Sequence, residues 1–425
     1  MTTIKLGMVG LGTVGQGVLK MVQQHADKIS AVTGCQVVVK TVMVRHPERH
    51  QDVAGVVHLT TELADILADP EIQLVVEVMG GIHPAKEVIE QLLRAKKHVV
   101  SANKDLIATY GRELNQLAQE NHCDLRYEAS VAGGIPILRA IADSFAADQI
   151  TAVKGIVNGT TNYILTQMGQ QHWSYEDALK QAQRLGFAEA DPTNDVTGKD
   201  AAYKMIILSQ FSFGSSLPLG AFAVTGIDQV AAADVAQAAN FGYVLKLIGD
   251  ARLVDDRLFI EVAPTLVEQG HPLATVNNEN NAVMVTGQAV GDTLFYGPGA
   301  GGLPTATSVL SDITTVIKNL VLKTTGNRFN RYRKALAPAS PATVADRYYL
   351  SLTMPDRPGE MMKLTAAMAK GGASFSQIVQ QAAVGGQARV MIITHQMSKA
   401  QLATLAAELA ATETIRLNCA YKVIE

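Results

Sequence analysis

Short apolar runs alternate with amphipathic segments over the first third of the chain. Strands are predicted at 4–9, 36–44, 74–78, 98–101 and 124–127, with helices at 16–24 and 85–95. In the first of these helices Val18, Leu19 and Val22 recur at helical spacing. This β-α alternation is typical of an open, mostly parallel sheet covered by helices.

The middle of the chain mixes both periodicities. Helices are predicted at 175–185 and directly after Gly198, and strands at 259–263 and 282–288. A second glycine-rich loop, 297–302, opens a long helix from about Thr305 to Leu322. Glycines packed this densely suggest a close approach of the backbone to a ligand or to another chain segment.

The last quarter of the chain has its own regular order. Residues 335–345 are rich in Ala, Pro, Ser and Thr and are typical of a linker. Beyond them the pattern predicts strand, helix, strand, strand, helix, strand, the ferredoxin-like βαββαβ order. The predicted boundaries are therefore a first domain at 1–130, completed by a helix at about 305–325, a second at 131–304, a linker at 335–347 and a third domain at 348–425.

Composition narrows the class of protein. A chain of 425 residues with 48% hydrophobic and 18% charged residues can form two or three globular domains. The net charge of −3 argues against nucleic acid and against an anionic membrane surface as partners. Neither a signal peptide nor a membrane span is predicted. Cys35, Cys123 and Cys419 lack metal or disulfide spacing, which fits a reducing cytoplasm.

The first strand leads into a glycine fingerprint. The run from Gly10 to Gly15, Gly-Leu-Gly-Thr-Val-Gly, lies between a strand and a helix. Glycines there allow a tight turn and let backbone amides approach a pyrophosphate, which the helix N-terminus favours. The predicted dinucleotide-binding residues are Gly10, Leu11, Gly12, Thr13, Val14 and Gly15.

Two basic residues follow later strands of the predicted sheet. The second strand ends at Arg45 and lacks the acidic residue that usually binds the ribose of NAD. The planar guanidinium of Arg45 can pair with a 2′-phosphate, which favours NADP. The alternative is that Arg45 is a solvated charge at the end of the strand. Lys104 lies on a loop after the 98–101 strand, at the edge where ligands bind in such sheets. By itself it could equally be a solvated lysine.

The stretch from Gly186 to Lys204 carries the strongest candidate chemistry. Asp200 and Lys204 are four residues apart near the start of a predicted helix, so they share one face. Glu189 comes from the Gly-, Pro- and Asp-rich loop before that helix. The alternative is an ordinary surface pair, worth about 0.2–0.5 kcal/mol.

Two further loops are rich in small residues. Residues 128–136 could direct several carbonyl oxygens towards a monovalent cation, with a simple tight turn as the alternative. The run Gly155 to Leu165, Gly-Ile-Val-Asn-Gly-Thr-Thr-Asn-Tyr-Ile-Leu, lies between an apolar strand and a helix start. Thr161 or Asn162 is the predicted N-cap of that helix.

Together these stretches resemble the homoserine dehydrogenases over residues 1–330. The matching motifs are Gly-Leu-Gly-Thr-Val-Gly, Ala102-Asn103-Lys104, the 155–165 run, 186–204 and 297–312. The resemblance implies reversible hydride transfer between L-homoserine with NAD(P)⁺ and L-aspartate 4-semialdehyde with NAD(P)H, on the route to threonine and methionine. It also implies a Rossmann domain followed by a mixed α+β substrate and dimerisation domain.

The resemblance assigns roles position by position. Lys204 would be the proton donor in the reducing direction, with Glu189 and Asp200 holding the substrate amino end and an ordered water. Lys104 would contact cofactor and substrate. Gly186 and Gly302 would line the cofactor. The implied sodium-binding turn comprises Glu128, Val131, Gly133 and Ile135. The pair Asp200 and Lys204 favours a charged lysine whereas burial opposes it, and the sequence leaves this open. Chemically, an ammonium group can stabilise and protonate the oxygen that gains charge during hydride transfer.

The C-terminal segment resembles an ACT domain. The run Asp356-Arg357-Pro358-Gly359 lies at its first strand-to-helix turn. The resemblance implies amino-acid binding, with L-threonine as the expected feedback inhibitor. A purely structural or dimerising appendage is the alternative, because the βαββαβ order is shared by many unrelated domains.

Two other functions deserve comparison. A semialdehyde dehydrogenase would need a nucleophilic cysteine, and no cysteine of this chain lies in such a setting, while a related amino-acid dehydrogenase stays open. A catalytically silent sensor of nucleotide and amino acid would not need Glu189, Asp200 and Lys204. An aspartokinase is not expected ahead of the fingerprint, which begins at Gly10. The family suggests a homodimer, which paired ACT domains could extend to a homotetramer.

Overall fold

The computed structural model describes residues 1–327, 329–330 and 335–425. The chain forms two compact units. Unit 1 contains 1–153, 203–218 and 280–335, and unit 2 contains 154–202, 219–279 and 336–425. The chain passes from one unit to the other within strand β7 (Ile150–Ile156) and again within helix α10 (Lys199–Phe213).

Unit 1 is built on a six-stranded parallel sheet. Its strand order is β3-β2-β1-β4-β5-β6. Successive strands are added on one side of β1 up to β3 and on its other side from β4 onward. This is the order of a dinucleotide-binding Rossmann sheet, whose ligand crevice lies at the carboxyl ends of the strands where the order reverses. The strands are β1 (Thr2–Val9), β2 (Cys35–Met43), β3 (His58–Thr60), β4 (Ile72–Glu77), β5 (His98–Ser101) and β6 (Leu125–Arg126).

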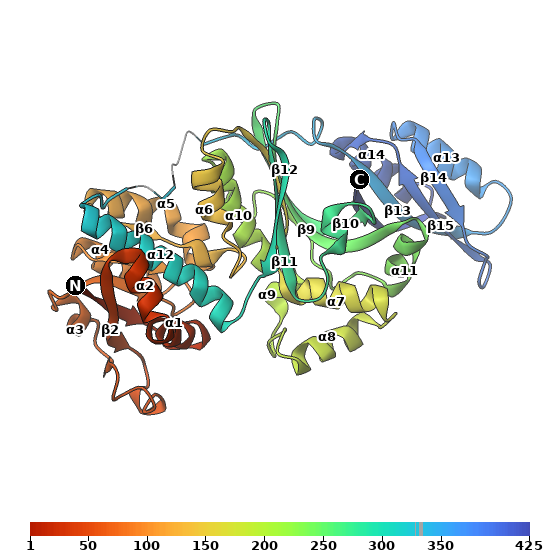
Figure 1. The fold of residues 1–425 in the computed structure, drawn as a ribbon. Helices are drawn as coiled ribbons and strands as arrows, with labels where there is room; N and C mark the ends of the chain where they lie inside the picture. The colour runs from red at the N-terminus through yellow and green to blue at the C-terminus, as the bar shows by residue number, and fades with distance from the viewer. Residues whose placement is uncertain (328, 331–334) are drawn as a thin grey trace. The chain divides into compact units, whose positions relative to one another are not determined.

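Helices from distant parts of the sequence cover this sheet. Helix α12 packs against α1, and its Val309, Ile313 and Val316 join the core formed by Val18 and the strand side chains. Figure 1 labels both helices in unit 1. Unit 1 also holds the antiparallel hairpin of β11 (Asn280–Gly287) and β12 (Gly291–Pro298). The helices are α1 (Thr13–Gln24), α2 (Ala26–Thr33), α3 (Leu63–Leu67), α4 (Ala85–Arg94), α5 (Lys104–Glu120), α6 (Ile137–Arg139) and α12 (Gly302–Leu322).

Unit 2 combines helices with a continuous set of strands. Long strands β9 and β10 pair in antiparallel register, and the C-terminal strand β17 adds to β10 in parallel. Unit 2 before the C-terminal segment contains α7 (Gly159–Gln170), α8 (Tyr175–Arg184), α9 (Thr193–Val196), β8 (Ala223–Val224), α11 (Ala232–Asn240), β9 (Tyr243–Val254) and β10 (Arg257–Glu268).

The C-terminal segment has the βαββαβ order that its sequence predicts. Its strand order β17-β13-β15-β14 is antiparallel throughout. Leu350 and Leu352 of β13 face a core with α13 and α14, whereas Tyr349 points to the opposite face. The elements are β13 (Ala345–Pro355), α13 (Glu360–Lys370), β14 (Phe375–Gln380), β15 (Gln387–Thr394), a short β16 (Met397–Ser398), α14 (Lys399–Ala410) and β17 (Arg416–Ile424).

Two local predictions were wrong. Lys104 does not lie on a loop but begins α5, because Asn103 caps this helix by accepting the backbone N–H of Leu106 at 3.2 Å. The N-cap of α7 is neither Thr161 nor Asn162 but Asn158, whose side chain accepts from Thr161 N. Within the described part of the chain, no helix has the length and hydrophobicity that a membrane crossing requires.

Candidate active site

The glycine loop of unit 1 has the geometry that its sequence predicts. Gly10 adopts φ +100°, and a Cβ there would lie 2.7 Å from the carbonyl oxygen of Val78. A Cβ on Gly15 would lie 2.7 Å from the Gly10 carbonyl oxygen. Gly12, the N-cap of α1, has open space around its Cβ position and supplies no capping side chain. The first amides of α1 are thus offered to an anion.

Helix α12 starts beside this loop. A Cβ on Gly302 would lie 3.0 Å from the carbonyl oxygen of Thr13, and one on Gly17 would lie 2.5 Å from the Gly302 oxygen. Gly302 is therefore close to the fingerprint, and its contact with cofactor stays a prediction. Gly186 belongs to unit 2, where it has φ +78° after α8. Its contact with cofactor stays a prediction.

The end of β2 exposes a basic side chain. Strand β2 ends at Met43, and Arg45 is exposed two residues later. His46 and Glu48 follow, with Nδ1 of His46 lying 3.0 Å from a Glu48 carboxylate oxygen. This places the Arg45 guanidinium at the carboxyl edge of the sheet, where the adenosine ribose lies in Rossmann domains.

A buried carboxyl group joins the ends of β4 and β5. Glu77 accepts the backbone N–H of Met79 at 2.9 Å and the Ser101 hydroxyl at 2.6 Å. Asn103 donates its side-chain amide to the Gly81 carbonyl at 2.6 Å. Burial raises the pKa of Glu77. These contacts fix the start of α5, and Lys104 is half-buried there, with its ammonium 3.6 Å from Asp105.

The turn proposed for sodium is tightly packed. Ala132 and Gly133 both have positive φ, and the Gly133 carbonyl accepts the Ser308 hydroxyl at 2.6 Å. The Ile135 carbonyl accepts the Ile137 N–H at 2.8 Å. Among the described residues, no group of three or more His, Cys, Asp and Glu side chains could hold a metal ion. A cation here would depend on the second lone pairs of main-chain oxygens.

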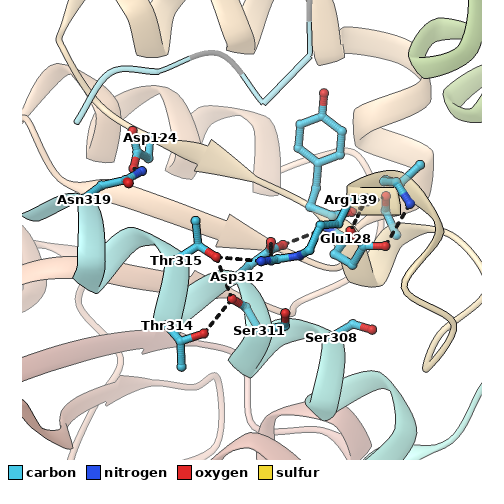
Figure 2. Close-up of polar contacts among 12 residues, drawn as sticks. Asp124, Glu128, Arg139, Ser308, Ser311, Asp312, Thr314, Thr315 and Asn319 are labelled. Carbon is cyan, nitrogen blue, oxygen red and sulfur yellow. Dashed lines mark hydrogen bonds and ion pairs between the residues drawn. The ribbon is translucent and has the colours of Figure 1, made fainter. Parts of the chain in front are cut away.

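The carboxylate of Glu128 is already engaged. Figure 2 shows it against Arg139, and its two oxygens accept the backbone N–H groups of Leu138 and Arg139 at 2.9 and 2.7 Å. Asp312 of α12 accepts the Glu128 N–H at 2.8 Å and the Arg139 guanidinium at 3.0 Å. Burial, and next the Asp312 charge, raise the pKa of Glu128 to about 7, and burial raises that of Asp312 to about 6. This cluster ties the turn to α12.

Unit 2 brings two carboxylates together. The side-chain nitrogen of Asn158 donates to Asp195 at 2.7 Å and to Asp200 at 2.8 Å. Asp200 is 7% exposed and lies in the first turn of α10, while Asp195 belongs to the short helix α9. Thr160 adds a weak contact to Asp195 at 3.4 Å. Glu189 lies on the exposed loop between α8 and α9.

Asp200 and Lys204 lie on the same helix, α10, as the sequence predicts. Lys204 follows Asp200 by four residues on one continuous helix and is half-buried. Residues four apart on a helix share one face. The helical spacing on which the sequence argument depended is confirmed.

Sequence reasoning missed Asn158 and Asp195. Asn158 directly follows an apolar strand and precedes a helix, which is the usual N-cap position, so its capping role was readable. Asp195 sits in a polar Pro-Thr-Asn-Asp run without any distinguishing sequence signal. Its approach to Asp200 arises from tertiary packing.

Comparison with known families agrees with this geometry. The family model described as "Homoserine dehydrogenase, NAD binding domain" matches residues 10–128, and the model "Homoserine dehydrogenase" matches residues 136–314. Together they cover strands β2 to β6 of the Rossmann sheet, the 155–165 run and the residues from Gly186 to Lys204.

Individual relatives match over their full length. A homoserine dehydrogenase of Bacillus subtilis is 45% identical, covering 100% of this chain and 99% of that protein. The crystal structure of a homoserine dehydrogenase from Thiobacillus denitrificans superposes with a TM-score of 0.94 at 36% identity, covering 100% of this chain and 99% of that one. A hyperthermophilic archaeal homoserine dehydrogenase, solved in complex with NADPH, gives a TM-score of 0.63 at 25% identity over 76% of this chain and 98% of that one. The chain therefore belongs to the homoserine dehydrogenase family, NAD(P)-dependent oxidoreductases that act on a CH–OH group.

Proposed function

We propose that this chain interconverts L-homoserine and L-aspartate 4-semialdehyde for threonine and methionine synthesis, with Lys204 and Asp200 at the reacting group. The observation that carries the proposal is the pair of carboxylates, Asp195 of α9 and Asp200 of α10, with Lys204 one turn after Asp200 on α10. In the oxidising direction the substrate hydroxyl gives its proton to Lys204, and its carbon gives a hydride to the nicotinamide. In the reverse direction the ammonium protonates the oxygen as the carbonyl is reduced.

The remaining residues bind and orient. Glu189 and Asp200 would hold the substrate amino group and an ordered water, since carboxylates accept from ammonium and water donors. Lys104, at the start of α5, would contact cofactor and substrate. The glycine loop and Gly302 would bind the pyrophosphate side of the cofactor, with Gly186 contributing from after α8.

The product distinguishes this reaction from that of an amino-acid dehydrogenase. Incubation with L-homoserine and NADP⁺, followed by hydrazine trapping and mass spectrometry, should yield the hydrazone of the 4-aldehyde with the amino group retained. Release of ammonia and a 2-oxo acid would overturn the proposal, because oxidation would then occur at the carbon bearing nitrogen.

NADP is the proposed preferred cofactor, with NAD as the alternative. The exposed guanidinium of Arg45 at the end of β2 supports this choice, as does the NADPH complex of the archaeal relative. A 2′-phosphate would form charge-assisted bonds with it.

Arg45→Ala is expected to lower kcat/KM for NADP⁺ on the order of ten- to a hundredfold, from loss of hydrogen bonds to a charged group. The value for NAD⁺ should change less than about threefold. Steady-state kinetics with both cofactors measures this, and Arg49→Ala, an exposed arginine in the following turn, is the matched control. Equal losses with both cofactors would remove the phosphate assignment.

A sodium ion is proposed at the turn of Glu128, Val131, Gly133 and Ile135. The two successive positive-φ residues support it, since they turn neighbouring main-chain groups within a short segment. The Glu128 carboxylate would act indirectly, by anchoring the turn to α6 through the Leu138 and Arg139 amides. The ion would therefore be held by main-chain oxygens.

The C-terminal domain is proposed as an ACT domain that binds L-threonine. Its βαββαβ order and its Asp356-Arg357-Pro358-Gly359 turn support this assignment. Two contacts would carry the effect of binding within unit 2. Buried Lys422 of β17 pairs with Asp250 at 2.6 Å and with Glu261 at 3.3 Å.

The second contact lies on the face of the C-terminal sheet opposite α13 and α14, where α11 packs. Asp234 of α11 is 3% exposed and accepts from Arg389 at 2.5 Å and from the Tyr349 hydroxyl at 3.0 Å. Helix α11 in turn packs against α7, the helix that Asn158 caps. A change in the C-terminal sheet could thus reach the carboxylate pair through two packed helices.

Asp234→Asn is expected to weaken inhibition by L-threonine at least about fivefold while leaving uninhibited turnover near the wild-type value. Asparagine keeps the shape but removes the charge that pairs with Arg389. Inhibition curves on the full chain measure this, with Asp228→Asn, an exposed carboxylate ahead of α11, as control. Unchanged inhibition would exclude this contact from the coupling route, and no inhibition of the wild type would exclude the threonine assignment.

Homodimers or homotetramers in the cytoplasm are proposed. Edge strand β12 exposes Leu294 and Tyr296, and edge strand β14 exposes Ile378 and Val379. Exposed apolar side chains on unpaired strand edges favour association. Light scattering in solution distinguishes monomer, dimer and tetramer.

The cytoplasmic location is supported by the three free cysteines, which are consistent with a reducing compartment.

A further inference from the structure

Asn158 lies between the end of β7 and the start of α7. It is 4% exposed, and its side chain makes four hydrogen bonds. The carbonyl oxygen accepts the backbone N–H of Thr161 at 2.8 Å and the Thr161 hydroxyl at 2.9 Å. The nitrogen donates to Asp195 at 2.7 Å and to Asp200 at 2.8 Å.

These contacts use the full capacity of the amide group. An asparagine side chain has two N–H donors and one oxygen with two lone pairs. The helix cap fixes the orientation of the Asn158 amide, because the backbone N–H of Thr161 needs the side-chain oxygen as its acceptor. The two N–H donors therefore face the two carboxylates, and a flipped amide would lose both of those bonds and the bond from the Thr161 backbone N–H.

Two carboxylates that share one nitrogen would otherwise repel each other. Hydrogen bonds to ionised oxygens are shorter and stronger than those between neutral groups. The amide donates to both carboxylates and so contributes to their orientation. Asp200 starts the helix that carries Lys204, so its orientation matters for the reaction proposed above.

We propose that Asn158 is a positioning residue, which holds Asp195 and Asp200 in the orientation that binds homoserine. The inference rests on the proposed role of Asp200. Asn158 acts through the two carboxylates and is not itself assigned a contact with substrate. A capping role alone is the competing explanation, and it predicts a different set of variant properties.

Asn158→Ser separates the two roles. Serine is also a strong N-cap, so it preserves the start of α7, but its single hydroxyl cannot bridge two carboxylates. Asn158→Ala removes both functions. Each variant is compared with wild type for kcat, for KM with L-homoserine, for KM with NADP⁺ and for the midpoint of thermal unfolding.

The serine variant should lose about tenfold or more in kcat/KM for homoserine, with KM for NADP⁺ and the unfolding midpoint close to wild type. The alanine variant should show a similar loss and also unfold at a lower temperature. Wild-type kinetics in the serine variant would overturn the inference and leave only a helix cap.

A double-mutant cycle with Asp200→Asn tests the route of action. Because Asn158 is proposed to act through Asp195 and Asp200, the serine substitution should cost less in that background than in wild type, with the remaining cost coming through Asp195. Fully additive losses would contradict the inference. Failure of the proposed function is distinguishable, because Asp200→Asn would then retain full activity by itself.

Discussion

Lys204→Ala should lower homoserine oxidation on the order of a hundred- to ten-thousandfold, the usual contribution of a positioned acid or base. The substrate oxygen must lose a proton as the hydride leaves its carbon, and Lys204 is the proposed acceptor. Cofactor binding should change less than about twofold, because the glycine loop that would hold the pyrophosphate is formed by other segments. Stopped-flow turnover and fluorescence titration of NADPH measure the two quantities separately.

Lys199→Ala is the matched control. It removes an exposed lysine from the first position of the same helix, and turnover should stay near the wild-type value. The unfolding temperature of both variants should resemble that of wild type. A Lys204 variant that turns over at the wild-type rate would exclude this lysine from the mechanism.

Gly12→Val should raise the KM for NADP⁺ on the order of a hundredfold without destabilising the protein in the absence of cofactor. Gly12 has φ −74°, which valine tolerates, and nothing lies near its Cβ position. The side chain would instead occupy the space from which the amides of α1 bind pyrophosphate, with loss of charge-assisted hydrogen bonds. Cofactor titration and thermal unfolding of the free protein measure the two effects.

Gly10→Ala provides the contrast. Its φ of +100° and the 2.7 Å approach to Val78 O make any side chain costly, so the free protein should unfold at a lower temperature. If Gly12→Val bound NADP⁺ normally, the loop would not hold the pyrophosphate. If it destabilised the free protein as much as Gly10→Ala, its effect would be structural.

Much of the fold was predictable because its local and global signals agree. The strand–glycine–helix run at Gly10 predicts a tight turn that only glycine allows, and Gly10 has a positive φ and lies close to the Val78 backbone. The C-terminal βαββαβ order follows from well-separated apolar runs between turn residues. The apolar face of α12 is visible as a helical repeat, and it packs in the core beside α1.

Other features depend on contacts that no local pattern carries. Asp195 meets Asn158 from a separate short helix, and the pairing of β17 with β10 joins residues about 160 positions apart. Lys104 begins α5 because the Asn103 side chain caps this helix, and the polar sequence Ala102-Asn103-Lys104 alone is equally compatible with a loop. The contacts of the Glu128 carboxylate with the backbone amides of Leu138 and Arg139 likewise arise from the tertiary fold, and its part in a sodium site stays a prediction.

The most direct test of the central claim is absorbance at the reduced-nicotinamide band with the wild-type chain and L-homoserine. The absorbance is recorded in separate reactions with NADP⁺, with NAD⁺, and with NADP⁺ plus L-threonine. The account predicts NADPH formation that depends on homoserine, proceeds faster than with NAD⁺ and is suppressed by threonine. Folded protein that reduces neither cofactor in the presence of L-homoserine would contradict it.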